Sequence, residues 1–265
     1  MSNSNNSRAN NRRVRRRLDV PFNLTSVNKN AKWIIKSGYR FLGRERTYYT
    51  NLPREIASLT RLESLYIQKH KFTWLPKEIG NLKNLTELNL SIGDLESLPK
   101  EIGNLKNLEK LIISNNKLRT LPKEIGLLKN LKKIDLDSNM MESLPKEIGN
   151  LKKLEKLTFE DNKLTSLPKE IGLLKNLEEL HLNDNKLTSI PKEIGLCKNL
   201  KYLWLAGNKL TSIPKEIEDL PKLSILSLRR NPGLKGISSE LRKSGLKLWK
   251  NTNTKFINYK YYTNQ

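Results

Sequence analysis

A proline recurs every 23 residues through most of the chain, and this period constrains the fold more than any other feature of the sequence. Eight prolines share the register, and Glu-Ile follows each one two and three residues later: Pro53, Pro76, Pro99, Pro122, Pro145, Pro168, Pro191 and Pro214. A period of roughly 20–50 residues is typical of a solenoid, in which each copy buries its apolar face only against its neighbours. The sequence therefore predicts one elongated repeat domain over residues 51–234.

Each copy combines a strand pattern with a short helical pattern. The apolar residues follow L-x-x-L-x-L-x-x-N-x-L, as at Leu108, Leu111, Ile113, Asn116 and Leu118. Their alternation has the period of a strand with one buried face, and only stacking into a parallel sheet can bury that face. Pro followed by Glu suits the first turn of a short helix. A glycine after the Ile is expected to end that helix, at Gly80, Gly103, Gly126, Gly149, Gly172 and Gly195.

The pattern resembles the leucine-rich-repeat superfamily, in particular its 23-residue type ending L-P-x-E-I-G-x-L-x-N-L. Such repeats are found in bacterial repeat proteins, intracellular Scribble-like scaffolds and large DNA viruses. The resemblance covers residues 51–234 without a gap. It implies an α/β solenoid, a horseshoe with a parallel concave sheet, eight 23-residue repeats and short helical returns on the convex side. It specifies the fold far more closely than the function.

A recurring asparagine is expected to turn inward and to bond backbone groups that would otherwise be buried without partners. It stands at Asn116, Asn139, Asn162, Asn185, Asn208 and Asn231. His70 and Gly93 occupy this position in the first two copies, so we expect a looser ladder there. Cys197 aligns with core leucines of the other copies and is predicted to be buried and unreactive.

The two ends depart from the repeat. Residues 28–50 look like an N-terminal cap or degenerate repeat, because a step of one repeat places Leu42 at a repeat position but Arg44 where an inward leucine belongs. Trp33, Ile34 and Ile35 are available to cover the open end of the core. Residues 231–234 slip the register by one, and 239–241 read as a helix start. The predicted segments are a basic extended arm at 1–27, the cap at 28–50, the repeats at 51–234, a C-terminal cap at 235–250 and a C-terminal arm at 251–265.

The net charge of +23 is concentrated at the ends. Residues 1–50 carry 12 Lys and Arg against 2 Asp and Glu, and residues 235–265 carry 7 against 1. The arm contains the run Arg12, Arg13, Arg15, Arg16 and Arg17 in an Asn/Ser-rich context. Such a run is typical of a nucleic-acid patch, a localisation signal or a tether into an acidic groove.

Composition and motifs favour an intracellular, non-catalytic protein. One cysteine permits no intrachain disulfide, and we find neither a signal-peptide pattern nor an apolar run long enough to span a membrane, so we expect a soluble cytoplasmic setting. The two histidines lie in different copies, and the chain has no Cys/His cluster, nucleophile motif or phosphate-binding glycine loop. We therefore predict no enzyme activity, cofactor, metal site or small-molecule substrate.

The variable positions beside each strand are predicted to project from the concave face. Exposed tyrosine and tryptophan on a rigid sheet often become binding hot spots, although the two rings could instead simply pack on each other. A neighbouring acidic zone is either a partner site or a solvated face. The candidate protein-binding residues are Tyr202, Trp204, His181, Asp135, Asp137, Glu160 and Tyr66.

The leading functional hypothesis is a protein-binding scaffold or adaptor. Two basic ends on a rigid body favour a structural component of a large assembly, such as a virus particle or capsid. One alternative is a nucleic-acid or ribonucleoprotein-associated accessory protein that uses the Arg-rich arm. Another is an effector or signalling protein that recognises a peptide on the concave face.

Overall fold

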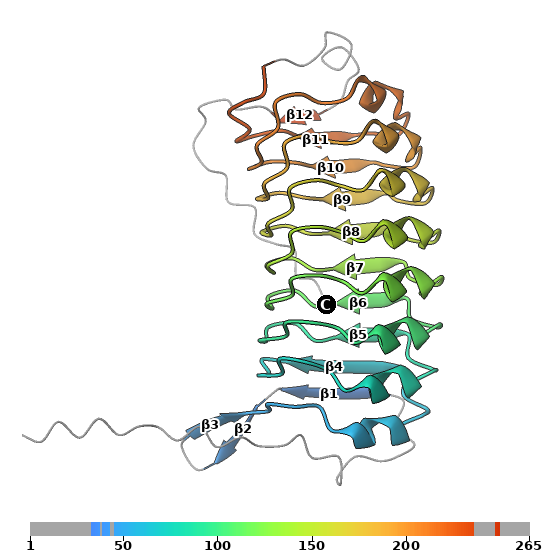
Figure 1. The fold of residues 1–265 in the computed structure, drawn as a ribbon, viewed down its shortest axis with the longest axis vertical. Helices are drawn as coiled ribbons and strands as arrows, with labels where there is room; N and C mark the ends of the chain where they lie inside the picture. The colour runs from blue at the N-terminus through green and yellow to red at the C-terminus, as the bar shows by residue number, and fades with distance from the viewer. Residues whose placement is uncertain (1–32, 38, 43–44, 236–246, 250–265) are drawn as a thin grey trace, which may run out of the picture.

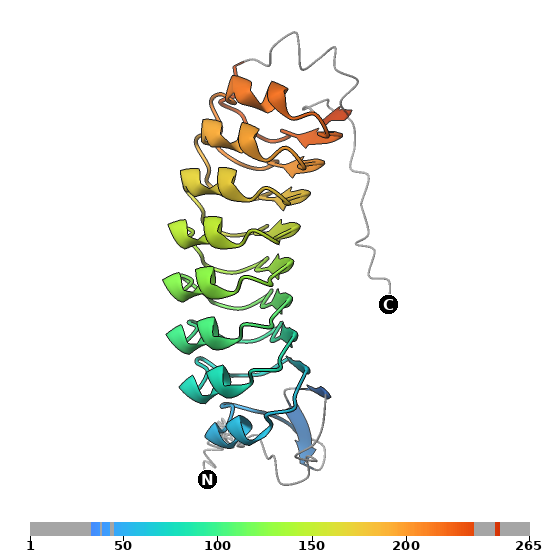
Figure 2. The same ribbon diagram turned by 90° about the vertical axis from the view of Figure 1, so that its right-hand side faces the viewer.

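The computed structural model describes residues 33–37, 39–42, 45–235 and 247–249. One ten-stranded sheet, with every strand pair parallel, runs along one side of the molecule, and short 3-10 helices run along the other (Figure 1). Figure 2 shows that the stack is bowed, with the helices on the outer side and the strands on the inner side. The predicted solenoid with a concave parallel sheet is confirmed.

Eight strands belong to the repeats, as predicted. Each pairs with the equivalent strand of the next repeat, so that Leu65 lies beside Leu88, and the middle residue of each three-residue strand is buried. The strands are β4 Ser64–Gln68, β5 Glu87–Asn89, β6 Lys110–Ile112, β7 Lys133–Asp135, β8 Lys156–Thr158, β9 Glu179–His181, β10 Tyr202–Trp204 and β11 Ile225–Ser227. Since only stacked copies bury the central apolar residue, the sheet and the core form together.

A five-residue 3-10 helix follows each repeat proline. Each helix begins directly after the proline, and the backbone N–H of the residue after the helix donates to the carbonyl of the buried Ile. The helices are η1 Arg54–Ser58, η2 Lys77–Asn81, η3 Lys100–Asn104, η4 Lys123–Leu127, η5 Lys146–Asn150, η6 Lys169–Leu173, η7 Lys192–Leu196 and η8 Lys215–Asp219. No helix within the described ranges is long and apolar enough to cross a membrane.

The repeat glycine does not end the helix, so the role predicted for it is wrong. Gly80 is the fourth residue of η2 and is buried. A Cβ atom built there would lie 2.6 Å from the carbonyl oxygen of Glu101 in the next return, and the same contact recurs along the stack. Glycine is needed because successive returns approach each other too closely for any side chain.

The inward asparagines form the predicted ladder. Asn162 accepts a hydrogen bond at Oδ1 from the backbone N–H of Met141 at 3.0 Å and donates through Nδ2 to the carbonyl of Leu136 at 2.9 Å. Equivalent bonds recur from Asn116 to Asn208, and each satisfies backbone groups inside the stack. Cys197 is fully buried as predicted, and burial raises the pKa of its thiol to about 11.

At His70 and Gly93 the ladder is altered but not left without partners, which corrects the looser ladder that we expected. The His70 ring is buried, and its Nε2 lies 3.0 Å from the carbonyl of Leu90. Its Nδ1 accepts the backbone N–H of Phe72, the donor that an asparagine at position 93 would otherwise take. A Cβ atom on residue 93 would lie 2.1 Å from this ring, so Gly93 makes room for His70.

The sheet continues past the repeats at both ends. β1 Trp33–Ser37 pairs in parallel with β4, and Trp33 lies opposite Ser64, an offset longer than one repeat. β2 Tyr39–Leu42 and β3 Glu45–Tyr48 form an antiparallel pair, so the repeat register predicted for Leu42 is wrong. β12 Lys247–Trp249 pairs with β11 at an offset slightly shorter than one repeat, whereas the slip predicted at 231–234 would lengthen it.

Several predictions fall on residues outside the described ranges. They are the arms at 1–27 and 251–265, the inward position of Arg44 and the helix start at 239–241. The same holds for the side chains of Trp33, Ile34 and Ile35, whose cover of the core stays a prediction.

Candidate protein-binding face

The outward side chains of the strands form columns across the concave sheet. The central column follows the strand register and contains Tyr66, Asn89, Ile112, Asp135, Thr158, His181, Trp204 and Ser227. Because parallel strands in register place equivalent residues side by side, each member lies beside its equivalents in the preceding and following repeats. The chemistry of this face therefore changes from one repeat to the next.

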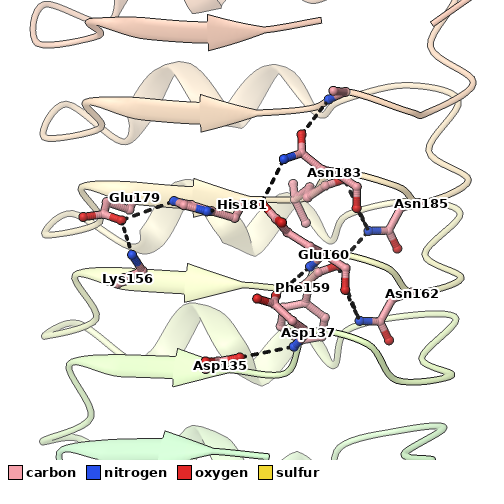
Figure 3. A network of polar contacts seen from close by, with 12 residues as sticks. Asp135, Asp137, Lys156, Phe159, Glu160, Asn162, Glu179, His181, Asn183 and Asn185 are labelled. Carbon is pink, nitrogen blue, oxygen red and sulfur yellow. Dashed lines mark hydrogen bonds and ion pairs between the residues drawn. The ribbon is translucent and has the colours of Figure 1, made fainter. Parts of the chain in front are cut away.

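His181 is the centre of a polar network that joins three repeats (Figure 3). Its Nδ1 lies 3.3 Å from Oε1 of Glu160, and its Nε2 lies 3.2 Å from Oε2 of Glu179. Lys156 donates to the same oxygen of Glu179 at 2.5 Å. Asn183 donates to Oε1 of Glu160 at 2.8 Å. The imidazole is thus held between two carboxylates in a fixed orientation.

These contacts shift the pKa values of the network. Burial lowers the pKa of His181, but hydrogen bonds to Glu160 and Glu179 outweigh burial, so the value is raised above 6.5. The hydrogen bond to His181 is the main reason that the pKa of Glu179 falls to about 2. An imidazole bonded by two carboxylates favours its charged form. These contacts therefore favour the cationic form of His181.

The acidic residues at the end of β7 behave differently. Oδ1 of Asp137 accepts the backbone N–H of Glu160 at 2.7 Å, and the backbone N–H of Asp137 donates to Oδ1 of Asp135 at 3.3 Å. Burial, followed by repulsion from Asp135, raises the pKa of Asp137 to about 7. Asp137 therefore changes charge close to neutral pH.

The structure brings five of the seven candidate residues into one neighbourhood. Asp135, Asp137, Glu160 and His181 lie on neighbouring repeats, and the rings of His181 and Trp204 are 5.8 Å apart and tilted by 43°. Trp204 is half-buried beside His181 on the next strand.

Tyr202 is on the same strand as Trp204, opposite Glu179 and Ile225. The ring contact that the structure describes for Trp204 is with His181 on the neighbouring strand. The alternative that Tyr202 and Trp204 pack on each other stays open.

Tyr66 lies apart from this group. It is in β4, six strands away from β10 in the order of the sheet. Burial, with help from a hydrogen bond to Glu87, raises its pKa to about 12. We therefore leave Tyr66 out of the site formed around His181.

The candidates chosen from the sequence leave out four residues of the network: Lys156, Thr158, Glu179 and Asn183. The signal that could have found them is the repeat spacing, because Lys156 and Glu179, and also Glu160 and Asn183, are equivalent positions of successive repeats. Within the part of the chain that the structure describes, no group of His, Cys, Asp and Glu could hold a metal ion.

Comparison with known proteins agrees with the repeat geometry. The family described as leucine-rich repeat region matches residues 35–113, 87–161 and 111–195, and the family described as leucine rich repeat matches 175–232. A search of curated proteins found no match. Together the family matches span most of the repeat domain.

Solved structures of similar proteins share the solenoid. A leucine-rich-repeat protein of Leptospira interrogans is 38% identical, with a TM-score of 0.55, 76% of this chain covered and 63% of that chain. The plant peptide hormone receptor RGFR1, in complex with RGF2, is 28% identical, with a TM-score of 0.54, 76% of this chain covered and 38% of that chain. The leucine-rich-repeat domain of the type III effector XopL, at 23% identity and a TM-score of 0.60, covers 84% of this chain and 69% of its own length, and shows the fold alone.

This chain spans less than two thirds of the first two of these proteins. Leucine-rich-repeat proteins generally act as protein-binding scaffolds or receptors, and no catalytic family matches. The repeat register, the asparagine ladder and the family matches lead to the same assignment: this chain belongs to the leucine-rich-repeat family.

Proposed function

We propose that this protein is a non-catalytic scaffold that binds a segment of a partner protein on its concave face, centred on His181 and Trp204. The observation that carries the proposal is the difference between the two sides of each repeat. The returns repeat the same residues, whereas the central column carries a different side chain on almost every strand. A rigid sheet with an aromatic pair and fixed polar groups has the features of a binding hot spot.

A matched pair of tryptophan variants tests this proposal. Trp204 is half-buried on the concave face, and Trp74 is 50% exposed between β4 and η2. A partner is first isolated with the full chain and then purified. Trp204→Ala should weaken its binding by about 30-fold, the loss expected when a hot-spot residue is truncated. Trp74→Ala should leave binding unchanged. Unchanged affinity for Trp204→Ala, with a large fall in thermal stability, would show that Trp204 is structural.

Incorporation into a large assembly, such as a virus particle or capsid, is the finer form of this proposal. Its support is the concentration of positive charge at the two ends of the chain, most of which lies outside the described residues. Co-sedimentation of the full chain with particles from its native source, and its loss on deleting residues 1–30, is the expected result.

Binding of nucleic acid by the arm is the alternative that the run of arginines favours. Neutralising about six phosphates of duplex DNA should give a slope near −5 in a plot of log affinity against log salt concentration. Deletion of residues 1–17 should abolish that binding. Unchanged affinity of the truncated chain for DNA would remove the arm from this role.

A further inference from the structure

We propose that the acidic centre of the concave face, formed by Asp135, Asp137 and Glu160 around Thr158, receives an arginine side chain of the bound protein segment. This inference rests on the proposed function and specifies the chemistry of the partner. It concerns one subsite only. The neighbouring rings of His181 and Trp204 form a second, mostly apolar subsite beside it.

The carboxylates of the acidic centre retain unused acceptor atoms. Oδ1 of Asp137 and Oε1 of Glu160 accept the bonds described above. Oδ2 of Asp137 and Oε2 of Glu160 receive no donor from any residue in the described ranges. The nearest lysine on β8, Lys156, is already bonded to Glu179. The described bonds therefore hold Asp137 and Glu160 in place, and none of them comes from a lysine or an arginine.

Thr158 supplies an independent sign that this centre lacks a partner. It is 4% exposed, and its hydroxyl makes no hydrogen bond to any residue that the structure describes. Burial dominates the pKa of Asp137. The Thr158 hydroxyl lies near enough to this carboxyl to favour its charged form, but not in the geometry of a hydrogen bond. Buried hydroxyls in folded proteins are almost always bonded. A cation bound at Asp137 would keep the carboxyl ionised and so give the hydroxyl a charged acceptor.

The chemistry of the centre favours a guanidinium over other cations. Arginine presents several N–H donors in one plane and can bond two carboxylates at once, whereas lysine acts as a point charge. No residue group in the described part of the chain can hold a metal ion.

The distance to the aromatic pair sets the spacing expected in the bound segment. Thr158 lies opposite His181, and His181 lies opposite Trp204, so two strand spacings, about 10 Å, separate β8 from the tryptophan. An extended segment covers that distance in about three residues, which predicts an apolar side chain three positions from the arginine.

The pH dependence of the acidic centre depends on all the charged groups that face it. β7 contributes Lys133 and Asp135, β8 contributes Lys156, and β9 contributes Glu179 and His181, with Asp137, Glu160 and Asp161 in the following turns. As the pH falls through about 7, Asp137 loses its negative charge, and acidification also favours the cationic form of His181. Both changes oppose a bound cation, so arginine binding should weaken on acidification.

The two histidines of the chain make the test direct. His181 borders the centre, and His70 is buried at the first position of the ladder, where it serves as an internal reference. The probe is a blocked hexapeptide, acetyl-Gly-Arg-Ser-Ser-Phe-Gly-amide, titrated into the full chain at pH 8 while NMR follows both imidazoles. The His181 signals should move with a saturating curve and those of His70 should not. Replacing the arginine of the probe by lysine should weaken binding by about fivefold.

Three conservative variants separate the subsite from general attraction of a basic peptide. Asp137→Asn and Glu160→Gln should each weaken the arginine probe by about tenfold. Glu87→Gln removes the same charge from the concave face three strands from β8 and should change binding less than twofold. Equal losses for Glu87→Gln, or equal affinities of the arginine and lysine probes, would overturn the arginine subsite.

The affinities of the Trp204→Ala and Asp137→Asn variants for the natural partner distinguish the arginine subsite from the proposed function. If Trp204→Ala weakens the partner and Asp137→Asn does not, the concave face binds the partner but the arginine subsite is wrong. If neither variant affects the partner, both the proposed function and the subsite fail. Loss of binding in both variants, with no fall in melting temperature, is the expected result.

Discussion

The returns and the strands of the same repeats use their side chains in different ways. On the convex side the returns repeat Pro, Lys (Arg in the first), Glu, Ile and usually Gly. They pack so closely that a Cβ at Gly172 would lie 2.3 Å from the carbonyl of Glu193. On the concave side the central column changes from Tyr66 to Asp135 and then to Trp204. The uniform residues of the returns pack the repeats into the stack. The outward residues of the strands take no part in that packing and can therefore vary.

The lysines of the returns belong to the uniform side. Lys83, Lys106, Lys152 and Lys175 donate through Nζ to the carbonyl of the repeat glycine in the same return, at 2.6 to 3.0 Å. Cations placed there satisfy carbonyls that a short helix leaves unpaired at its end. The sequence presents these lysines as surface charge. In four returns they also bond a carbonyl group at the end of the helix.

The largest expected effect comes from filling the close contact between two returns. Gly172→Ala places a methyl group against the carbonyl of Glu193 and should lower the free energy of unfolding by about 3 kcal/mol. The next residue, Leu173, is 42% exposed and serves as the control. Leu173→Ala should change stability by less than about 0.5 kcal/mol. Urea unfolding measures both, and equal effects would contradict the distinction between packed and exposed positions of a return.

The next effect compares two asparagines that both bond neighbouring repeats. Asn162 is buried, so Asn162→Ala leaves the N–H of Met141 without a partner, removes one of two donors to the carbonyl of Leu136, and should cost about 2 kcal/mol. Asn176 donates to the carbonyl of Lys152 at an exposed position. Because water can replace that bond, Asn176→Ala should cost less than about 1 kcal/mol. Thermal and urea unfolding of the two variants would sharpen the contrast between interior and surface.

A double-mutant cycle tests whether His70 and Gly93 replace the ladder as a unit. Gly93→Asn alone forces a side chain into the His70 ring and should be destabilising. The double variant His70→Asn, Gly93→Asn restores the ladder residues of the other copies and should recover stability, with a coupling energy of about 1.5 kcal/mol. Additive losses in urea unfolding would show that the two positions act independently.

The smallest expected effect concerns the charge of the concave face. The pKa of Asp137 is raised to about 7 from 3.8, so the folded state binds its proton more tightly than the unfolded state. Stability from this group is therefore lost as the pH rises from about 4 to about 7. Asp137→Asn removes the loss, and its gain over the natural chain should be about 1 kcal/mol larger at pH 8 than at pH 5, after allowance for solvent screening. His181 acts in the same direction, because its raised pKa stabilises the folded state most below pH 6.5.

A matched comparison isolates the contribution of Asp137. Urea unfolding of the natural chain and of Asp137→Asn at pH 5, 6, 7 and 8 gives the difference directly. Glu87→Gln at the same pH values is the control, since it removes a carboxylate from the same face. A difference for Asp137→Asn that does not change with pH would show that this carboxyl has an ordinary titration.

The sequence by itself determined the repeat architecture and the core. The repeat period defines which leucines face inward, and the copies cannot bury them except by stacking. The positions of the strands, the short helices and the inward asparagines follow from that pattern. The outward direction of Asp135, His181 and Trp204 follows from strand alternation alone.

Only the tertiary structure decided which of these side chains act together. The links from Glu160 to His181 and from Lys156 to Glu179 depend on contacts between successive repeats. The role of Gly172 depends on the backbone of the following return, and that of Gly93 on a ring in the preceding repeat. At the N-terminal end the 23-residue period stops. There β1 pairs with β4 at an offset longer than one repeat, which no local sequence pattern predicts. Local periodicity fixes the direction of a side chain, but its partners and its charge depend on what the neighbouring repeats place beside it.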